Sequence, residues 1–263
     1  MGKKMAKQMK ALVKKAVNAF GYDLVRKTPY RWPGELDEFD LDLVRYIQKK
    51  EFTMVSLERL INTIKACKYV CENNIPGDFV ECGVWRGGNG ILAQKIFQKF
   101  GVKKKVWMYD TFSGMTEPST VDVNIYTGKK ALEKYIQKQR SSYNEWSFSP
   151  LEEVKNNCTE SSLDLASFEF IQGDVCETLK VSSNLPEKIA VLRLDTDWYE
   201  STRAELENLY PNVSNGGVLI IDDYGSWDGS RKAVDEYFSK AAYKPLFNVV
   251  DLDARSAVKW DAN

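Results

Sequence analysis

Two short acidic segments, Asp195-Thr196-Asp197 and Asp222-Asp223, stand at the ends of apolar, strand-like runs. Open α/β sheets present ligand-binding groups at the carboxyl ends of their strands, so adjacent strand ends would bring Asp195 close to Asp222 and Asp223. Clustered carboxylates repel one another unless a cation offsets their charge, and hard oxygen ligands suit Mg²⁺ or Ca²⁺. The segments predict a divalent metal site, unless some of these acids only cap the helices that follow.

Asp197 is the candidate proton acceptor. By strand alternation it points away from Asp195 or lies just beyond the strand, where it could take a proton from a hydroxyl group. A metal held at Asp195 would lower the pKa of that hydroxyl and fix its oxygen in line with a methyl donor. Asp195 and Asp197 are therefore the predicted catalytic residues, and group transfer is the predicted chemistry.

A glycine-rich loop follows an earlier strand-like run at 79 to 83. Its glycines let the backbone turn tightly and approach a ligand closely, and the next helix would point free N–H groups at polar atoms. The spacing differs from that of the dinucleotide motif G-x-G-x-x-G. The four glycines of the loop are Gly83, Gly87, Gly88 and Gly90.

Three further acids stand where a nucleoside cofactor would bind. Glu81, just before the loop, suits a cationic group such as the amino group of S-adenosylmethionine better than a pyrophosphate. Asp110 closes the next strand, where a carboxylate would accept hydrogen bonds from ribose hydroxyls. Asp174 ends a third strand, where an adenine edge would lie, unless it is a plain turn residue. Arg193, Arg203 and Arg231 are candidates for holding an anionic group or for ion pairing.

Composition excludes several classes of chemistry. Histidine is absent from the 263 residues, which rules out an imidazole base, a Ser-His-Asp triad and a His-ligated metal. The five cysteines have no disulfide-like spacing, and reduced core thiols are a better interpretation of Cys67 and Cys71 than a shared metal. With no apolar run long enough to span a bilayer and no secretory signal, we expect a cytoplasmic protein.

The elements that must position these residues alternate between strand and helix from residue 78 onward. This alternation predicts an α/β fold with a mostly parallel, doubly wound sheet. Before residue 78, Ser56 is predicted to cap the N-terminus of a helix that ends near 73 to 77. Strands are expected at 79–83, 105–110, 168–172, 189–195, 216–222 and 246–251, and helices at 89–100, 151–163, 200–210 and 230–241.

The sequence predicts that the chain is divided into three parts. Residues 1–31 hold nine Lys or Arg against one acid and are expected to form a basic amphipathic arm. This arm either lies on an anionic membrane surface or packs on the body or a partner subunit. Residues 32–77 form a helical segment, and 78–263 form the cofactor-binding domain. Within that domain, about 111–150 is too long for a simple crossover and is expected to be a lid or acceptor-binding insertion.

Several of these segments resemble the macrocin O-methyltransferase family, which comprises S-adenosylmethionine- and metal-dependent sugar O-methyltransferases. The likeness runs from about residue 53 to the C-terminus. It is carried by the segments 53–60, 75–88, 109–115, 194–202, 221–225 and 229–235, which include Val80-Glu81-Cys82-Gly83-Val84-Trp85-Arg86-Gly87-Gly88 and Leu194-Asp195-Thr196-Asp197-Trp198-Tyr199.

The resemblance implies a Rossmann-like methyltransferase fold with an N-terminal helical extension, and it implies a homo-oligomer. It also implies Mg²⁺ at Asp195, Asp222 and Asp223, a base at Asp197, and a sugar or glycoside acceptor. The acceptor would be a glycosylated metabolite or a surface glycan. Contacts to S-adenosylmethionine are expected at Glu81, Gly83, Val84, Trp85, Gly87, Asp110, Thr111, Ser113, Asp174 and Asp195.

Two alternatives remain open at this point. Asp195-Thr196-Asp197 also has the form of the D-x-D triplet with which metal-dependent glycosyltransferases hold a nucleotide diphosphate. A non-enzymatic, membrane-associated scaffold that uses the basic arm is the other alternative. A nucleic-acid partner is not expected, because no basic stripe with interleaved aromatics continues into the body.

Overall fold

The computed structural model describes residues 9, 13, 15, 17 and 19 and residues 32–260. The basic arm predicted over 1–31 therefore lies, apart from those five positions, outside the described residues. Residues 39–260 belong to one compact unit, and the fold is described for this unit.

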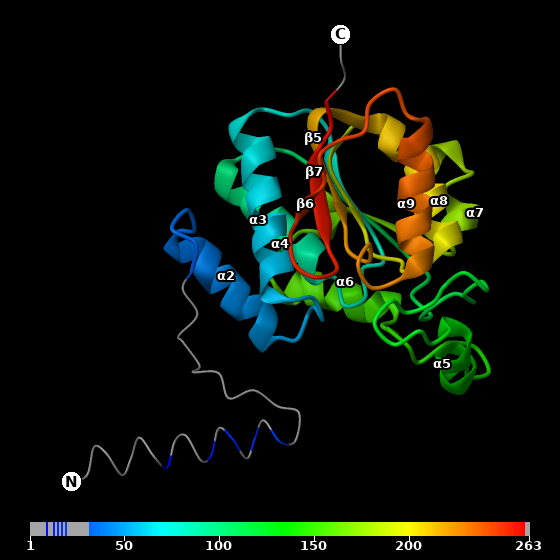
Figure 1. Cartoon of the computed structure of the whole chain (residues 1–263). Coiled ribbons are helices and arrows are strands. Elements are labelled where there is room, and N and C mark those ends of the chain that lie inside the picture. The colour runs from blue at the N-terminus through cyan, green and yellow to red at the C-terminus, as the bar shows by residue number, and fades with distance from the viewer. Residues whose placement is uncertain are drawn as a thin grey trace. The chain divides into compact units, whose positions relative to one another are not determined.

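A single seven-stranded sheet organises the unit, in the order β3-β2-β1-β4-β5-β7-β6 (Figure 1). The first five strands in this order are parallel, and β7 runs antiparallel to both β5 and β6. The mostly parallel, doubly wound sheet predicted from the sequence is thus confirmed. The strands are β1 Asp78–Cys82, β2 Val106–Asp110, β3 Phe168–Gln172, β4 Ile189–Leu194, β5 Val213–Ile221, β6 Asn248–Val249 and β7 Arg255–Val258.

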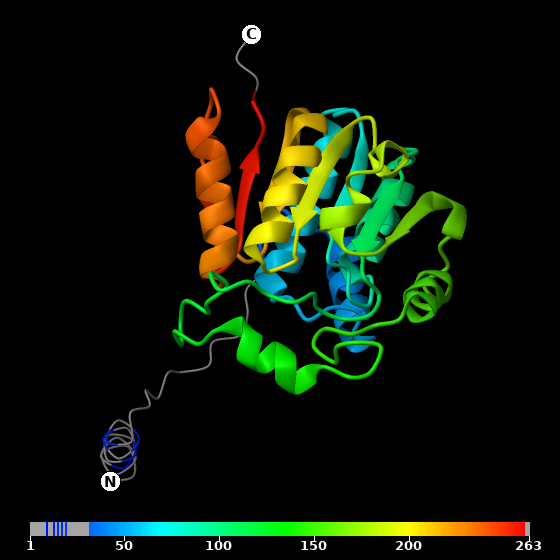
Figure 2. The same ribbon diagram turned by 90° about the vertical axis from the view of Figure 1, so that its right-hand side faces the viewer.

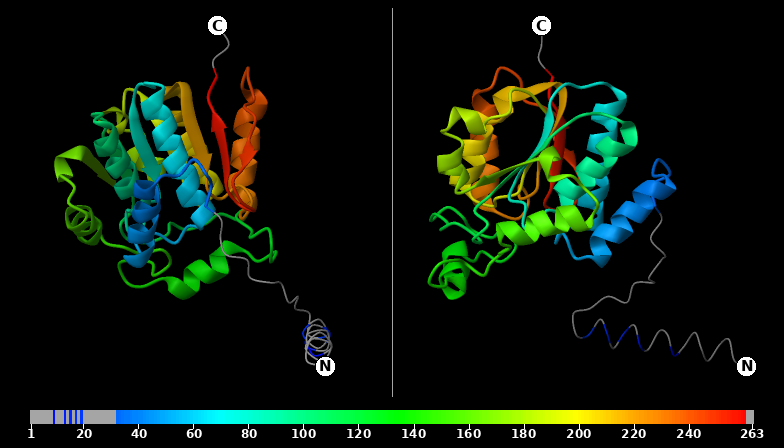
Figure 3. Two further views of the ribbon diagram at one scale, coloured as in Figure 1. Left: turned by 90° about the vertical axis from the view of Figure 1, so that its left-hand side faces the viewer. Right: turned by 180° about the vertical axis from the view of Figure 1, so that it is seen from behind.

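Helices cover both faces of the sheet. Helices α3 and α4 pack together on one face, and α8 and α9 pack together on the other (Figures 1 and 3). Ser56 caps α3 as predicted, because its Oγ accepts a hydrogen bond from the Arg59 backbone N–H. The helices are α2 Glu38–Lys49, α3 Leu57–Glu72, α4 Gly88–Phe100, α5 Ala131–Lys138, α6 Leu151–Glu160, α7 Val175–Thr178, α8 Tyr199–Asn208 and α9 Asp228–Lys240.

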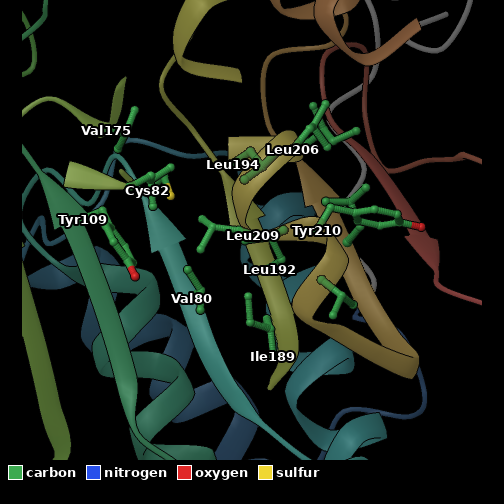
Figure 4. Close-up of a cluster of buried hydrophobic side chains, with 14 of the residues drawn as sticks. Val80, Cys82, Tyr109, Val175, Ile189, Leu192, Leu194, Leu206, Leu209 and Tyr210 are labelled. Carbon is green, nitrogen blue, oxygen red and sulfur yellow. The ribbon is translucent and has the colours of Figure 1, made fainter. Parts of the chain in front are cut away.

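The central strands carry the core. Strand β4 is buried along its whole length, and Val80, Leu192 and Leu194 belong to one apolar cluster with Leu206 of α8 (Figure 4). Strands covered on both faces read as continuous apolar runs, which is why 189–194 was recognisable as a strand. This packing fixes the carboxyl ends of β1, β4 and β5 relative to one another.

Those strand ends lie in register. Leu194 pairs with Cys82 on one side and with Ile221 on the other. The ladder continues one residue further, since the Asp195 N–H donates to the Cys82 carbonyl and the Asp222 N–H donates to the Leu194 carbonyl, both at 2.9 Å. Segment 111–150, with α5, lies at this end of the sheet, below it in Figure 2.

Two features of the C-terminal region differ from the prediction. The strand expected at 246–251 is only the two-residue β6, and a further strand, β7, lies at 255–258.

In the parts of the chain that the structure describes, none of the helices combines the length and apolarity needed to cross a membrane.

Candidate active site

A cavity opens at the carboxyl ends of the parallel strands. Its empty space, which includes open solvent, is about 940 Å³. Its walls come from the strand ends, the start of α3 and the 111–150 segment. The lining residues are Met54, Val55, Arg59, Gly83, Trp85, Tyr109, Asp110, Thr111, Gly114, Met115, Thr116, Trp146, Ser147, Gly173, Asp174, Val175, Asp195, Thr196, Asp197, Ser201 and Asp222.

Gly83 allows β1 and β4 to approach each other at the floor of this cavity. It has a φ of 81°, and a Cβ placed on it would lie 1.9 Å from the Asp195 carbonyl oxygen. Only glycine fits this position, because any other side chain would meet a backbone atom that cannot move without shifting Asp195.

Replacing Gly83 by alanine is expected to weaken binding of S-adenosylhomocysteine strongly and to lower the melting temperature. The matched control is Gly101→Ala, since Gly101 also has a positive φ, 65°, but nothing lies within 4 Å of its added Cβ. The free energy of unfolding of the control should fall by only about 1–2 kcal/mol, the cost of the left-handed backbone conformation alone. Calorimetric titration and thermal unfolding of both variants test this, and equal effects at the two positions would contradict it.

Asp110 holds the glycine-rich loop in place. One carboxylate oxygen accepts hydrogen bonds from the Val84 and Trp85 N–H groups at 2.8 and 3.2 Å, and the other accepts from the Phe112 N–H at 2.7 Å. Burial raises the pKa of Asp110, and these N–H donors oppose the rise. Asp110 lies in the cavity wall and shapes the turn that a cofactor would contact.

The predicted metal ligands come together at the opposite side of the cavity floor. One carboxylate oxygen from each of Asp195, Asp222 and Asp223 lies within 4.8 Å of the other two. Burial raises the pKa of Asp222 to about 7. Burial and the charges of Asp197 and Asp195 raise the pKa of Asp223 well above its usual range. Burial is the first cause of both rises, and the charge of Asp195 adds to them.

Asp197 lies against the same cluster. Its backbone has a φ of 66°, and its N–H donates to Asp223 Oδ2 at 3.2 Å. Burial, and then the charge of Asp195, raises the pKa of Asp197 to about 7. Just behind it, Thr196 donates to the fully buried Glu205 of α8 at 2.8 Å, which fixes the turn that carries Asp195 and Asp197.

Arg193 lies beneath the acids and is completely buried. Its guanidinium donates to Glu81 Oε1 at 2.9 Å, to Asp195 Oδ2 at 2.6 Å, and to Asp222 Oδ1. Burial raises the pKa of Glu81 to about 8, and the charge of Arg193 opposes this rise. Arg193 therefore links the ends of three strands and partly neutralises three carboxyl groups.

Arg59 of α3 approaches the cluster from the cavity wall. It donates to Asp222 Oδ2, to Asp251 Oδ2 at 2.8 Å, and to Asp253 Oδ2 at 2.6 Å. Burial alone would lower the pKa of this guanidinium, but the surrounding carboxylates raise it above its usual value. It remains a permanent positive charge beside Asp222.

Aromatic side chains form the end of the cavity nearest Asp197. Trp146 lines the cavity, and its ring contacts Trp198 and Trp227 with centroids 5.3 and 5.9 Å apart. The ammonium group of Lys134, on α5, lies 3.7 Å from the centroid of the Trp146 ring. Of these four side chains Trp146 is the one in the cavity lining, where its indole could contact a ring-shaped ligand.

Eight of the predicted site residues line the cavity. They are Gly83, Trp85, Asp110, Thr111, Asp174, Asp195, Asp197 and Asp222. Five others, namely Glu81, Val84, Gly87, Ser113 and Asp223, lie outside the lining. Glu81 pairs with Arg193 below the floor, the Val84 N–H supports Asp110, and Asp223 completes the acid cluster from behind.

The three arginines considered from the sequence have different surroundings. Arg193 is the buried partner of the acids, Arg203 pairs with Glu200 on the exposed face of α8, and Arg231 donates to the Tyr224 carbonyl. Sequence reasoning gave no role to Arg59, Lys134 or Glu205. Arg59 did stand in a motif just after the Ser56 cap, and that position was its only signal.

The strand order, the glycine-rich loop after β1 and the acids after β4 and β5 define a Rossmann-like methyltransferase of the S-adenosylmethionine-dependent class. The chain belongs to the macrocin O-methyltransferase (TylF) family, whose model matches residues 8–260. It is therefore an O-methyltransferase. Family membership favours methyl transfer over the two alternatives, a glycosyltransferase and a non-enzymatic scaffold.

Two characterised relatives cover most of the chain. Demethyldecarbamoylnovobiocin O-methyltransferase of Streptomyces niveus is 35% identical over 79% of this chain and 74% of its own length. The 8-demethyl-8-(2,3-dimethoxy-alpha-L-rhamnosyl)-tetracenomycin-C 4'-O-methyltransferase of Streptomyces olivaceus is 34% identical over 91% of this chain and 88% of its own length.

Solved structures show the same fold. The O-methyltransferase NovP is 33% identical to this chain, with a TM-score of 0.68 over 80% of this chain and 83% of its own. CalS11, a calicheamicin methyltransferase, is 16% identical, with a TM-score of 0.58 over 91% of this chain and 100% of its own. The second likeness concerns the fold alone.

Proposed function

We propose that this protein transfers the methyl group of S-adenosylmethionine to a sugar hydroxyl of a glycosylated metabolite or surface glycan, assisted by Mg²⁺. The observation that carries this proposal is that Asp195, Asp197 and Asp222 line the same cavity as Gly83 and Trp85 of the glycine-rich loop. The names of relatives support the acceptor class, since one acts on a rhamnosyl-tetracenomycin and another is a mycinamicin III 3''-O-methyltransferase.

The residues of the chain divide the chemistry between them. Gly83, Asp110 and Asp174 would hold the cofactor so that its methyl group faces the acid cluster. Asp197 would take the proton of the acceptor hydroxyl, and the oxygen would attack the methyl carbon as the bond from that carbon to sulfur breaks. The products are a methyl ether and S-adenosylhomocysteine. Trp146 and Lys134 would orient the acceptor.

The acid cluster fits a divalent cation. Its donors are carboxylate oxygens, which Mg²⁺ prefers, and burial together with the neighbouring carboxylates raises the pKa of Asp223 well above its usual range, so a cation would be stabilised here. Asp195, Asp222 and Asp223 would hold the ion. When bound, Mg²⁺ supplies Lewis-acid chemistry that lowers the pKa of an acceptor hydroxyl.

Calorimetric titration with S-adenosylhomocysteine tests the proposal, alongside a nucleoside diphosphate with and without Mg²⁺. Binding of S-adenosylhomocysteine at micromolar concentration, followed by methyl transfer to a rhamnoside-bearing acceptor, is the expected result. Binding of the nucleoside diphosphate alone, and only with Mg²⁺, would instead assign the acids to glycosyl transfer.

Asp195→Asn is expected to abolish turnover while leaving the affinity for S-adenosylhomocysteine nearly unchanged. Asparagine keeps the shape of the side chain but removes the charge that a cation and Arg193 both use. Turnover is measured with labelled S-adenosylmethionine, and affinity is measured by calorimetry. Equal losses of turnover and cofactor affinity would show that Asp195 serves the cofactor and not the acceptor.

Three further properties belong to the same proposal. We infer a homo-oligomer and a cytoplasmic location. Contact with a membrane surface through residues 1–31 stays a prediction from the sequence. Size-exclusion chromatography with light scattering tests the oligomer, and flotation with anionic vesicles before and after removal of residues 1–31 tests the membrane contact.

A further inference from the structure

Arg59 contacts Asp222, which is one of the predicted metal ligands, and two further acids. Its guanidinium is held by three carboxylates, and its side chain is only 14% exposed. Asp222 belongs to the acid cluster, whereas Asp251 and Asp253 belong to the turn between β6 and β7. Arg59 thus bridges the predicted metal ligands and a second, separate pair of acids.

Asp222 differs from the other two acids of the cluster in how its oxygens are used. Arg193 donates to Oδ1 of Asp222 and Arg59 donates to Oδ2, so each oxygen already contacts a guanidinium group. Asp195 meets Arg193 through Oδ2, and Asp223 accepts hydrogen bonds from the Asp197 N–H and the Ser226 hydroxyl. A metal ion that uses Asp222 therefore meets a charged competitor, because arginine does not lose its proton in proteins.

The second pair of acids gives Arg59 a place to remain if it releases Asp222. Asp251 is firmly held, because its Oδ1 accepts hydrogen bonds from the Asp253 and Ala254 N–H groups and its Oδ2 accepts one from the Ser56 hydroxyl. Two of the three ion pairs of Arg59 would survive its release from Asp222. The release would leave no uncompensated charge in the cavity wall, which is the costly outcome for a poorly exposed ion pair.

We propose that Arg59 sets the affinity of the acid cluster for its divalent cation, by competing for Asp222 Oδ2 with a strength that Asp251 and Asp253 control. This inference rests on the metal site of the proposed function. Arg59 is a positioning residue in this account, since it acts on the reaction through Asp222. If the ion pairs of Arg59 with Asp251 and Asp253 were weakened, Arg59 would pair more strongly with Asp222. The affinity of the acid cluster for the metal ion would then fall.

The experiment is calorimetric titration of the full chain with Mn²⁺, repeated with Mg²⁺, in the presence of S-adenosylhomocysteine. Arg59→Gln is expected to bind both ions about tenfold more tightly than the wild type, because the competing charge is gone. Asp251→Asn is expected to bind them more weakly, and Asp253→Asn serves as a second variant with the same expectation. Arg59→Lys keeps a positive charge but cannot bridge three carboxylates, so its affinity for the ions should lie between those of the wild type and Arg59→Gln.

The opposite signs distinguish competition from a merely structural role. If Arg59 only maintained the fold of the site, Arg59→Gln and Asp251→Asn would both weaken metal binding, and that result overturns the inference. Unchanged affinity in Arg59→Gln overturns it as well. If neither the wild type nor any of the variants binds either ion, the proposal of a metal site is wrong. Methyl transfer measured in excess EDTA would then show that the transferase function stands without it.

Discussion

Replacing Asp197 by asparagine is expected to lower the turnover number by about 10²- to 10⁴-fold, the usual contribution of a positioned proton acceptor. Asp197 lines the cavity beside Asp195, at a backbone position with a φ of 66°. Asparagine tolerates this left-handed conformation and keeps the shape of the side chain, so the turn should persist. Its uncharged amide, however, cannot accept the hydroxyl proton.

The matched control for this variant is Asp228→Asn, at an exposed position in the first turn of α9. It also removes one carboxylate, at a position beyond strand β5, and should leave turnover near the wild-type value. Both variants are assayed at saturating acceptor, and their cofactor affinity is measured separately with S-adenosylhomocysteine. An Asp197→Asn enzyme that retained about half of the wild-type turnover would assign the proton transfer to another group.

Replacing Arg193 by methionine is expected to produce the largest loss of stability of any single change at the site. Arg193 is fully buried and pairs with Glu81, Asp195 and Asp222. Removing one partner of a buried ion pair leaves charge uncompensated and costs about 3–5 kcal/mol. Methionine fills much of the same volume, so the loss reports the missing charge more than a cavity. Chemical unfolding should show this difference in free energy.

The loss should become smaller as the pH is lowered. Glu81 has a folded-state pKa of about 8, above the value of 4.5 for an unperturbed glutamate, and burial is the main cause. Without Arg193 this pKa would rise further, so the folded variant would bind a proton that the unfolded chain releases. Below about pH 8 Glu81 carries its proton in both folded proteins, so this part of the loss appears only as the pH rises above about 8, and it disappears as the pH is lowered.

Arg203→Met is the control for the arginine replacement. Arg203 and Glu200 form a pair three residues apart on α8, with both side chains about half exposed. Exposed pairs of this kind contribute at most about 1 kcal/mol, so this variant should unfold close to the wild type at every pH. Similar losses for Arg193→Met and Arg203→Met would refute the role given to the buried network.

The sequence was most informative where a strand is buried on both faces. The apolar runs before Gly83, Asp195 and Asp222 predicted three neighbouring strands, and because parallel strands end at the same edge of a sheet, the acids could be expected to converge. The N-cap of α3 was equally recognisable, since Ser56 precedes an amphipathic run. These features depend on residues close together in the chain.

Features that depend on packing were not predictable in the same way. Strand β7 is four residues long and contains Arg255 and Ser256, so it lacks the apolar run that marked the central strands. Its place in the sheet comes from antiparallel pairing with β5. Arg59 could not be assigned to Asp222, because their 163-residue separation is bridged only when α3 packs beside the sheet.

The position of Glu81 illustrates the same limit within the site. Its charge and its place before the glycine-rich loop suggested a contact with the cofactor. In the fold its side chain is 1% exposed and lies against Arg193, which comes from the neighbouring strand β4. Residue type identified the right region of the molecule, and the direction of the side chain decided its partner.

The contact of Trp146 with Trp198 and Trp227 has a practical consequence. Trp146 belongs to segment 111–150, whereas the other two indoles belong to the parts of the chain that precede α8 and α9. The molecule thus carries a natural fluorophore on each side of the boundary between that segment and the strand ends. If segment 111–150 moved away from the strand ends, these indole rings would be exposed to water and their emission would shift to longer wavelengths. Rearrangement during turnover can therefore be followed by fluorescence without an attached dye.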